Sequence, residues 1–201
     1  MLIRGAQPED ALAVARVHVR SWQSAYKGHL PDDYLAGLDP VARAERYSFG
    51  IDRADTPHTV LAVDEDEGRV IGFATTGPCA DAGTRGRLGE LYGLYVDPDR
   101  WRTGCGRQLM TAARARLAGL GFREAVLWVL DGNSRAESFY RADGWTRDGA
   151  ERDEVLGPTG GAAPPRPAPA PWCGRRSMRS VTSATSEPCH GAGAVNAAGY
   201  R

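Results

Sequence analysis

One stretch of this chain limits its possible folds more than any other. An apolar strand at Leu88–Val96 is closed by Asp97-Pro98-Asp99, and Gly104 and Gly106 follow where the helical segment Leu109–Leu117 begins. Backbone N–H groups at a helix start, together with the positive end of the helix, form a site for an anion such as phosphate. A tight turn explains Gly-x-Gly alone equally well. The stretch therefore predicts a strand, a loop and a helix, and leaves the ligand open.

The rest of residues 1–156 alternates between strand and helix patterns. The predicted strands are Leu2–Ile3, His58–Val63, Val70–Thr76, Ala125–Leu130 and a last one entered through Gly144-Trp145-Thr146. The predicted helices are Pro8–Trp22, a piece after Leu30-Pro31-Asp32-Asp33, Val41–Tyr47 and Ser134–Ala142, with Gly119 as the C-terminal cap of the helix after Gly106. This order predicts an α/β fold with a mixed sheet and helices on both faces.

The composition changes abruptly near Gly157. Residues 157–201 are rich in Gly, Pro, Ala and Ser, and Gly160–Pro167 has no apolar period. A chain of 201 residues has room for one ordinary domain and a tail. We expect residues 1–156 to be the folded domain and 157–201 to be a linker or disordered tail.

Charge and cysteine spacing restrict the partners. The formal net charge is zero and Lys27 is the one lysine, so no nucleic-acid-binding surface is expected. No apolar run reaches the length of a signal-peptide core or a membrane span, which favours a cytoplasmic protein with no membrane partner. The four cysteines, Cys79, Cys105, Cys173 and Cys189, have neither CxxC spacing nor histidines at zinc distances, so we expect reduced thiols and no metal.

Two familiar phosphate loops do not match the glycine stretch. A P-loop needs Gly-Lys-Ser or Gly-Lys-Thr, and the one lysine lies far from Gly104. The Rossmann fingerprint needs a third glycine where Leu109 stands. A different kind of loop is required.

The same stretch resembles the acetyl-CoA motif of the GNAT superfamily of N-acetyltransferases, usually written Gln/Arg-x-x-Gly-x-Gly/Ala. Leu94–Pro98 is followed here by Trp101-Arg102-Thr103-Gly104-Cys105-Gly106, with Trp101 where the motif has Gln or Arg. A second element, Asn133–Tyr140, resembles Asn-x-x-Ala-x-x-Phe-Tyr and leads into Gly144-Trp145. The resemblance covers about residues 1–155. It implies a mixed, mostly antiparallel sheet that is splayed between two strands, and acetyl-CoA as the co-substrate.

The resemblance also implies a role for each matched position. Backbone N–H groups of the loop bind pyrophosphate, and two arginines can add charge; the loop residues are Trp101, Arg102, Thr103, Gly104, Cys105, Gly106 and Arg107. Strand residues Leu94, Tyr95 and Val96 bind pantetheine in the manner of an added strand, with Leu94 and Val96 as the pairing positions, and Gly93 is consistent with the bulge this needs. The second element contributes Asn133 and Ala136 to the coenzyme site.

Two residues are expected to move protons. In the resembled family the tyrosine at position 140 lies near the thioester sulfur, and a phenol with an ordinary pKa near about 10 stays protonated at neutral pH and can donate to the leaving thiolate. Tyr140 can instead be a core aromatic. Glu90 stands at the distance from Gly104 that resembles the glutamate base of histone-modifying members, and burial in a strand would raise its pKa. A structural hydrogen bond or ion pair is an equally good reading of Glu90.

The acceptor pocket of the family is built largely by the N-terminal helices. Trp22 and Tyr26 are four residues apart on one helix face and can receive a cation on their rings, or they can be ordinary core. The chain is thus expected to acetylate a small-molecule or peptide amine. The rival interpretations are a non-catalytic acyl-CoA-binding or regulatory module, and a nucleotide-binding protein.

The tail departs from the resemblance. Family members usually finish with one more strand, where this chain has Gly/Pro-rich sequence. Either the tail is a genuine extension, or a reading-frame change has replaced the last strand. In the second case the sheet has an unpaired edge, which predicts lower stability or a homodimer that covers the edge.

Overall fold

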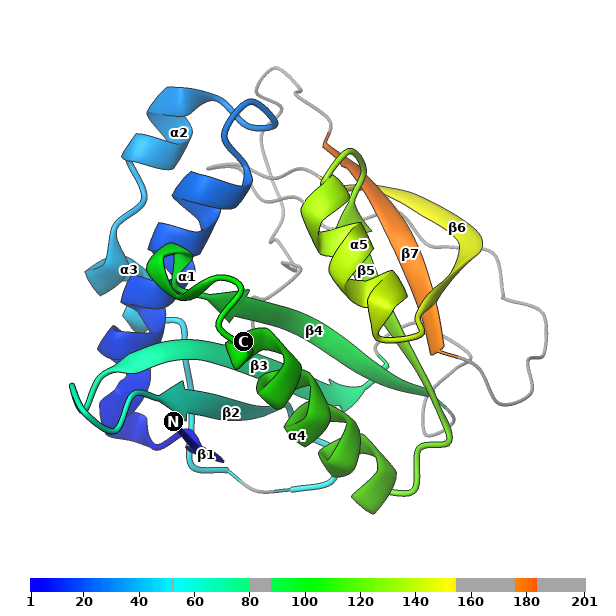
Figure 1. Cartoon of the computed structure of the whole chain (residues 1–201), viewed down its shortest axis with the longest axis horizontal. Helices are drawn as coiled ribbons and strands as arrows, with labels where there is room; N and C mark the ends of the chain where they lie inside the picture. The colour runs from blue at the N-terminus through cyan, green and yellow to red at the C-terminus, as the bar shows by residue number, and fades with distance from the viewer. Residues whose placement is uncertain (52, 80–87, 155–175, 184–201) are drawn as a thin grey trace.

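A computed structural model describes residues 1–51, 53–79, 88–154 and 176–183. The described strands form one seven-stranded sheet in the order β1-β2-β3-β4-β5-β7-β6, with helices on both faces (Figure 1). The strands are β1 Leu2–Gly5, β2 His58–Val63, β3 Val70–Pro78, β4 Leu88–Val96, β5 Glu124–Leu130, β6 Thr146–Glu154 and β7 Arg176–Ser183. The helices are η1 Pro8–Asp10, α1 Ala11–Ala25, α2 Asp32–Ala36, α3 Pro40–Ala44, η2 Pro98–Arg100, α4 Cys105–Gly119 and α5 Ser134–Ala142.

The expected mixed sheet is confirmed. Strands β1 to β4 pair antiparallel, and β4 pairs parallel with β5. The predicted third helix ends early, at Ala44, and the glycine in the left-handed conformation after α4 is Gly121 (φ +86°), not Gly119, which is the last helical residue. Glycine adopts this conformation without the steric cost that a Cβ would add.

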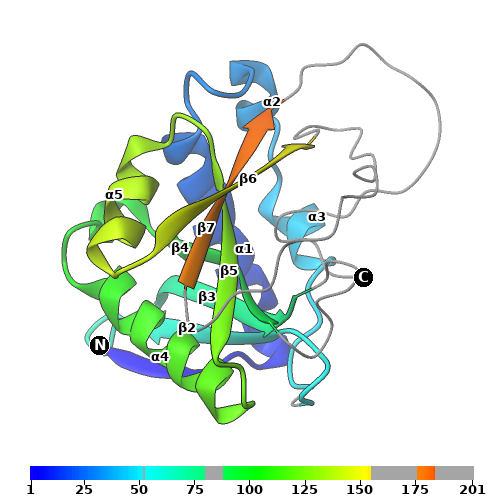
Figure 2. The same cartoon turned by 90° about the vertical axis from the view of Figure 1, so that its right-hand side faces the viewer.

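Two apolar clusters hold the helices on the two faces (Figure 2). On one face α4 packs Leu109, Met110 and Ala113 against the strands, and this cluster includes Tyr140 of α5. On the other face α1 packs Val14 and Val17 against β2 and β3. These helices bury one stripe each, as the helical spacing of their apolar residues predicts.

Strand β4 contains the feature that forms the site. Thr75 of β3 pairs with Gly93, but Thr76 pairs with Leu91, so Tyr92 is an extra residue and β4 has a bulge beside Gly93, as expected. Pairing of β4 with β5 stops at Leu91, although both strands continue. The sheet therefore splays between the two strands, as expected from the resemblance.

The C-terminal part departs from expectation. Most of residues 157–201 lies outside the described residues, so the predicted disorder and the suggested reading-frame change are not tested. Within this region, however, β7 lies between β5 and β6 and runs parallel to both. The expectation that no strand follows the Trp145 strand was wrong, because the eight residues of β7 contain neither Gly nor Pro although the surrounding sequence is rich in both.

Candidate active site

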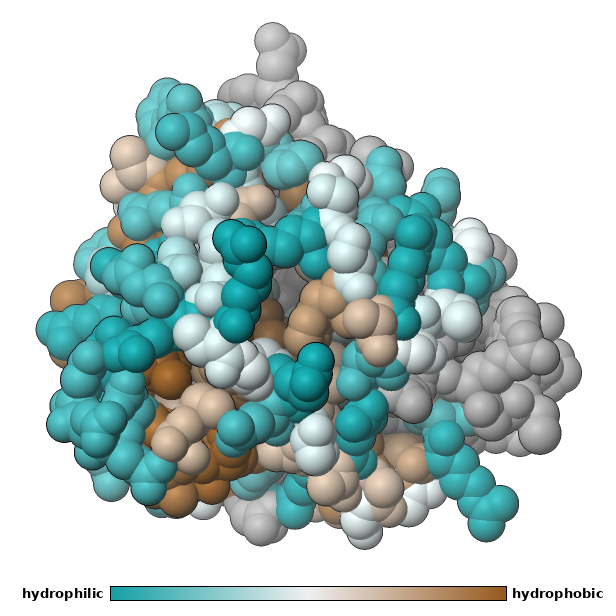
Figure 3. Space-filling model, viewed as in Figure 1, coloured by the Kyte–Doolittle hydropathy of each residue, from teal (hydrophilic) through white to brown (hydrophobic). Residues whose placement is uncertain are grey.

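A cavity of about 540 Å³ occupies the opening between the splayed ends of β4 and β5. Its walls come from the end of α1, the loop after β4, the end of β5, and α5. The space-filling view shows a hollow in this face, with hydrophobic residues inside and hydrophilic residues at the rim (Figure 3). The cavity is large enough for a small ligand.

The backbone of β4 faces into this opening at two positions. The Asp97 N–H donates to the Ile71 carbonyl at 2.8 Å, which fixes the alternation of the antiparallel pairing with β3. Leu94 and Val96 then occupy non-hydrogen-bonded pairs, and their N–H and C=O groups point away from β3 toward the splay. Both residues line the cavity, as does Tyr95. An extended amide-containing ligand could add to β4 here as a further strand.

The carbonyl of Val96 is already engaged. It accepts the Ser21 hydroxyl at 2.8 Å and the Trp101 indole N–H at 2.9 Å. The N–H of Val96 and both backbone groups of Leu94 are thus the groups that a ligand can use. Trp101, the departure from the motif, stabilises the end of β4 by this hydrogen bond.

The loop between β4 and α4 has the conformation of an anion site. Arg102 (φ +64°) and Gly104 (φ +90°) are both left-handed, so successive N–H groups turn toward one concave side. A non-glycine residue in this region costs about 1–2 kcal/mol. The loop leads directly into the 15-residue helix α4, whose N-terminus is positive. These features fit a diphosphate.

Not every predicted loop residue reaches the cavity. Its lining includes Trp101, Arg102, Gly104, Gly106 and Arg107. The Thr103 hydroxyl donates to the Arg100 carbonyl at 2.8 Å, and the Cys105 side chain is buried in the core, where burial raises the pKa of its thiol to about 11. These two residues can contribute backbone groups only. The high pKa also argues against Cys105 as a nucleophile.

Helix α5 places its motif residues on the opposite wall. The Asn133 side chain caps the helix by accepting the Ala136 N–H at 3.1 Å, which leaves its amide N–H₂ as the possible donor to a ligand. A Cβ on Gly106 would lie 3.3 Å from Phe139, so glycine permits the close approach of α5 to α4. Asn133, Ala136, Phe139 and Tyr140 all line the cavity.

Tyr140 is buried as well as cavity-lining. Its exposed fraction is 8%, and its ring contacts Phe139 and Trp145 edge-on at centroid distances of 5.4 and 6.3 Å. Burial, with a smaller contribution from Tyr95, raises the pKa of Tyr140 above its usual value. The phenol is therefore protonated at any physiological pH, which suits a proton donor.

Glu90 is the predicted catalytic residue that the structure does not bring to the cavity. It is buried in the paired part of β4, opposite Gly77 and Val126, and is not among the cavity-lining residues. Tyr92 lies near Glu90, lines the cavity and donates a hydrogen bond to the Pro78 carbonyl. Burial raises the pKa of Tyr92, and the charge of Glu90 raises it further. A direct contact of Glu90 with an acceptor amine is not supported by this position.

Trp22 and Tyr26 form the wall supplied by α1. Their rings meet edge-on, 5.0 Å apart at 88°, and both line the cavity. Trp22 also stacks on His18 at 5.1 Å and is 4% exposed. Trp22 is therefore packed in the core on one side and lines the cavity on the other, and its contact with an acceptor stays a prediction.

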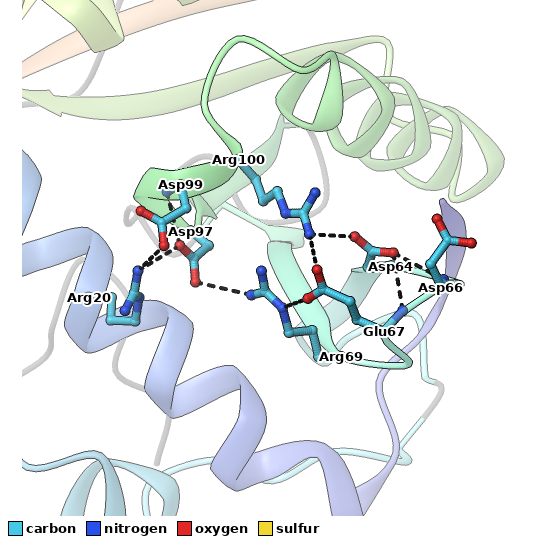
Figure 4. Close-up of polar contacts among 8 residues, drawn as sticks. All are labelled: Arg20, Asp64, Asp66, Glu67, Arg69, Asp97, Asp99 and Arg100. Atoms are coloured by element: carbon cyan, nitrogen blue, oxygen red, sulfur yellow. Dashed lines mark hydrogen bonds and ion pairs between the residues drawn. The ribbon is translucent and has the colours of Figure 1, made fainter.

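An ion-pair network beside the cavity holds the start of the loop (Figure 4). The carboxylate of Asp97 is buried; it accepts Arg20 of α1 at 3.1 Å and the Asp99 N–H at 3.0 Å, and lies 3.5 Å from Arg69. Arg20 also binds Asp99 at 2.7 Å. This network ties the end of β4 to α1 and β3. The sequence showed Asp97 only as a strand terminator.

The second half of the network ties the loop to the β2–β3 hairpin. Arg100 pairs with Asp64 at 2.8 Å and with Glu67 at 2.6 Å, and Arg69 pairs with Glu67 (Figure 4). Asp64 also accepts the Asp66 N–H at 3.1 Å. The charged turn between β2 and β3 therefore also anchors η2.

The sequence interpretation missed several cavity-lining residues, among them Ser21, Tyr92, Arg100, Trp128 and Arg135. Arg135 lies inside the second motif, but at one of its variable positions. In the described part of the chain, no group of three or more His, Cys, Asp or Glu side chains is placed to hold a metal ion. The helices of the described residues include none that is long and apolar enough to cross a membrane.

Comparison with known proteins identifies the family. The sequence matches the model of the Acetyltransferase (GNAT) family over residues 19–145. It is 31% identical over 155 residues to the uncharacterized N-acetyltransferase YuaI of Bacillus subtilis, and the match spans 77% of this chain and 86% of that protein. This chain belongs to the GNAT acetyltransferase family. The GNAT match includes both motifs that line the cavity.

Other relatives of this GNAT enzyme share only a part of their length with it. The mycothiol acetyltransferase of Kocuria rhizophila is 39% identical over 89 residues, which are 44% of this chain and 29% of that protein. The chain spans less than half of the mycothiol acetyltransferases that it matches. The PaiA N-acetyltransferase of Thermoplasma acidophilum, solved with coenzyme A, has the same fold at a TM-score of 0.58 and 22% identity, over 73% of this chain and 90% of that one.

Proposed function

We propose that this GNAT protein transfers the acetyl group of acetyl-CoA to a primary amine by direct attack within a ternary complex. The observation that carries the proposal is the continuity of the cavity with two backbone sites. The outward groups of Leu94 and Val96 suit the amides of pantetheine, and the left-handed turns at Arg102 and Gly104 suit a diphosphate. One ligand, acetyl-CoA, has both parts in the required order.

The bound thioester would lie between Tyr140 and the α1 wall. The amine nitrogen would form a bond to the acetyl carbon, the bond from that carbon to sulfur would break, and the Tyr140 hydroxyl would give its proton to the thiolate. The amine must lose one proton overall. Glu90 is our proposal for the group that receives it, and its position outside the cavity lining requires a water between the amine and the carboxylate.

The acceptor is proposed to be a small-molecule or peptide amine whose apolar part lies against Trp22 and Tyr26. Aromatic faces bind both apolar groups and cations, so amines with a flat or apolar body are the first to test. The cytoplasmic location and the possible homodimer remain predictions.

Release of free CoA thiol from acetyl-CoA, measured across a panel of aromatic, aliphatic and peptide α-amines, tests this function. We expect turnover that requires both substrates and a product that carries one acetyl group on nitrogen. Reactions without amine measure hydrolysis and serve as the control. Tight CoA binding with no turnover for any amine would instead support a non-catalytic binding module.

A further inference from the structure

One contact bridges the two sides of the splayed sheet at the mouth of the cavity. The guanidinium carbon of Arg135, in the first turn of α5, lies 3.3 Å from the centroid of the Trp101 ring. Trp101 belongs to the loop after β4, and α5 follows β5, so the contact joins the elements that continue the two separated strands. Both residues line the cavity.

Within the part of the chain that the structure describes, the charge of Arg135 has no carboxylate counter-ion. Among the described residues, no carboxylate lies within ion-pair distance of Arg102, Arg107 or Arg135, whereas the neighbouring Arg100 pairs with two acidic side chains. Burial lowers the pKa of Arg135, so its environment disfavours the charge that it nevertheless carries. A partly buried cation without a partner is stabilised when a ligand supplies an anion.

We propose that Arg135 is a coenzyme-binding residue that donates to the diphosphate of acyl-CoA and is positioned for this by stacking on Trp101. The inference rests on the proposed function. Stacking engages the face of the guanidinium and leaves its edge N–H groups to form paired hydrogen bonds with phosphate oxygens. In this chain the guanidinium of Arg135 therefore reaches the start of the loop from α5. Trp101, which stands where the motif has Gln or Arg, provides the ring on which this guanidinium stacks.

Calorimetric binding of two probes, CoA and pantetheine, tests the assignment, because pantetheine has no phosphate. Arg135→Ala is expected to weaken CoA binding about tenfold to a hundredfold, as for the loss of charge-assisted hydrogen bonds, and to leave pantetheine binding within about twofold. The CoA affinity of Arg135→Ala should also depend less on salt than that of the unmodified protein. Arg141→Ala, on the same helix but 61% exposed, is the matched control.

A double variant separates positioning from packing. Trp101→Arg combined with Arg135→Ala returns the guanidinium to the loop and should recover most of the lost CoA affinity. Equal losses for CoA and pantetheine in Arg135→Ala would show that the residue only holds α5 in place, and would overturn the proposal. Unchanged CoA binding in Arg135→Ala would overturn it as well. If the unmodified protein binds neither probe, the proposed function itself fails.

Discussion

Replacement of Tyr140 by Phe removes one oxygen atom from the centre of the cavity wall. The ring would keep its edge-on contacts with Phe139 and Trp145, and the residue stays in a helix that Asn133 caps. The free energy of unfolding should therefore change by less than about 1 kcal/mol, the usual value of one hydrogen bond. The variant tests chemistry without disturbing the fold.

The expected loss of rate follows from proton donation. A positioned general acid contributes about 10² to 10⁴ in rate, which corresponds to about 3–5 kcal/mol of transition-state stabilisation. Because the Leu94 backbone and the turns at Arg102 and Gly104 are unchanged, the KM for acetyl-CoA should stay within about threefold. The loss should thus appear in kcat.

The assay is steady-state thiol release with a fixed good acceptor, between pH 6.5 and 9.5. Burial raises the pKa of Tyr140, so the phenol stays protonated throughout this range and its ionisation should cause no fall in kcat toward high pH. Tyr34→Phe, in α2 and away from the cavity lining, is the control. A kcat for Tyr140→Phe within about threefold of the unmodified enzyme, with unfolding unchanged, would refute proton donation by Tyr140.

Three further outcomes follow from the described contacts. Asp97→Asn weakens a buried junction of ion pairs and should raise the KM for acetyl-CoA about tenfold with little change in kcat. The control Asp55→Asn, at an exposed ion pair, should change neither constant. A rise in the KM for the amine alone would contradict this prediction. Gly72→Ala places a Cβ 2.9 Å from Leu109 and 3.0 Å from a backbone carbonyl, so urea unfolding should show a loss of about 1–3 kcal/mol. The Arg4 guanidinium lowers the pKa of Asp10 below its usual value, so the ionised carboxylate stabilises the fold at neutral pH and this effect is lost as the pH falls through the lowered pKa; Asp10→Asn should cost about 1 kcal/mol at pH 7, and the cost should shrink steadily as the solution is acidified.

The strand, loop and helix around the proposed coenzyme site could be predicted because the motif constrains backbone conformation. A strand, two glycines and a helix start constrain where N–H groups point, and the resemblance to the family implied Leu94 and Val96 as the pairing positions. The bulge beside Gly93 and the splay after Leu91 followed the same logic. The loop conformation depends less on side-chain identity than on the backbone, which is why the loop tolerates Trp101 where the motif has Gln or Arg.

The roles that depend on side-chain direction could not be predicted. Glu90 stands at a suitable distance along the chain, but it is buried near Tyr92 and is not among the residues that line the cavity. Arg135 occupies a variable motif position, and only its contact with Trp101 shows which way it points. The strand β7 was missed because composition was averaged over a tail in which eight residues differ from their surroundings.

Three consecutive residues of α1 link the proposed acceptor wall to the proposed coenzyme loop. Arg20 binds the carboxylate of Asp97, Ser21 donates to the carbonyl of Val96, and Trp22 lines the cavity. A shift of α1 that admits a larger acceptor must therefore disturb the end of β4, where the phosphate loop begins. Substitutions that enlarge the Trp22 wall are consequently expected to change the KM for acetyl-CoA together with the choice of amine, although Trp22 itself lies outside the phosphate loop.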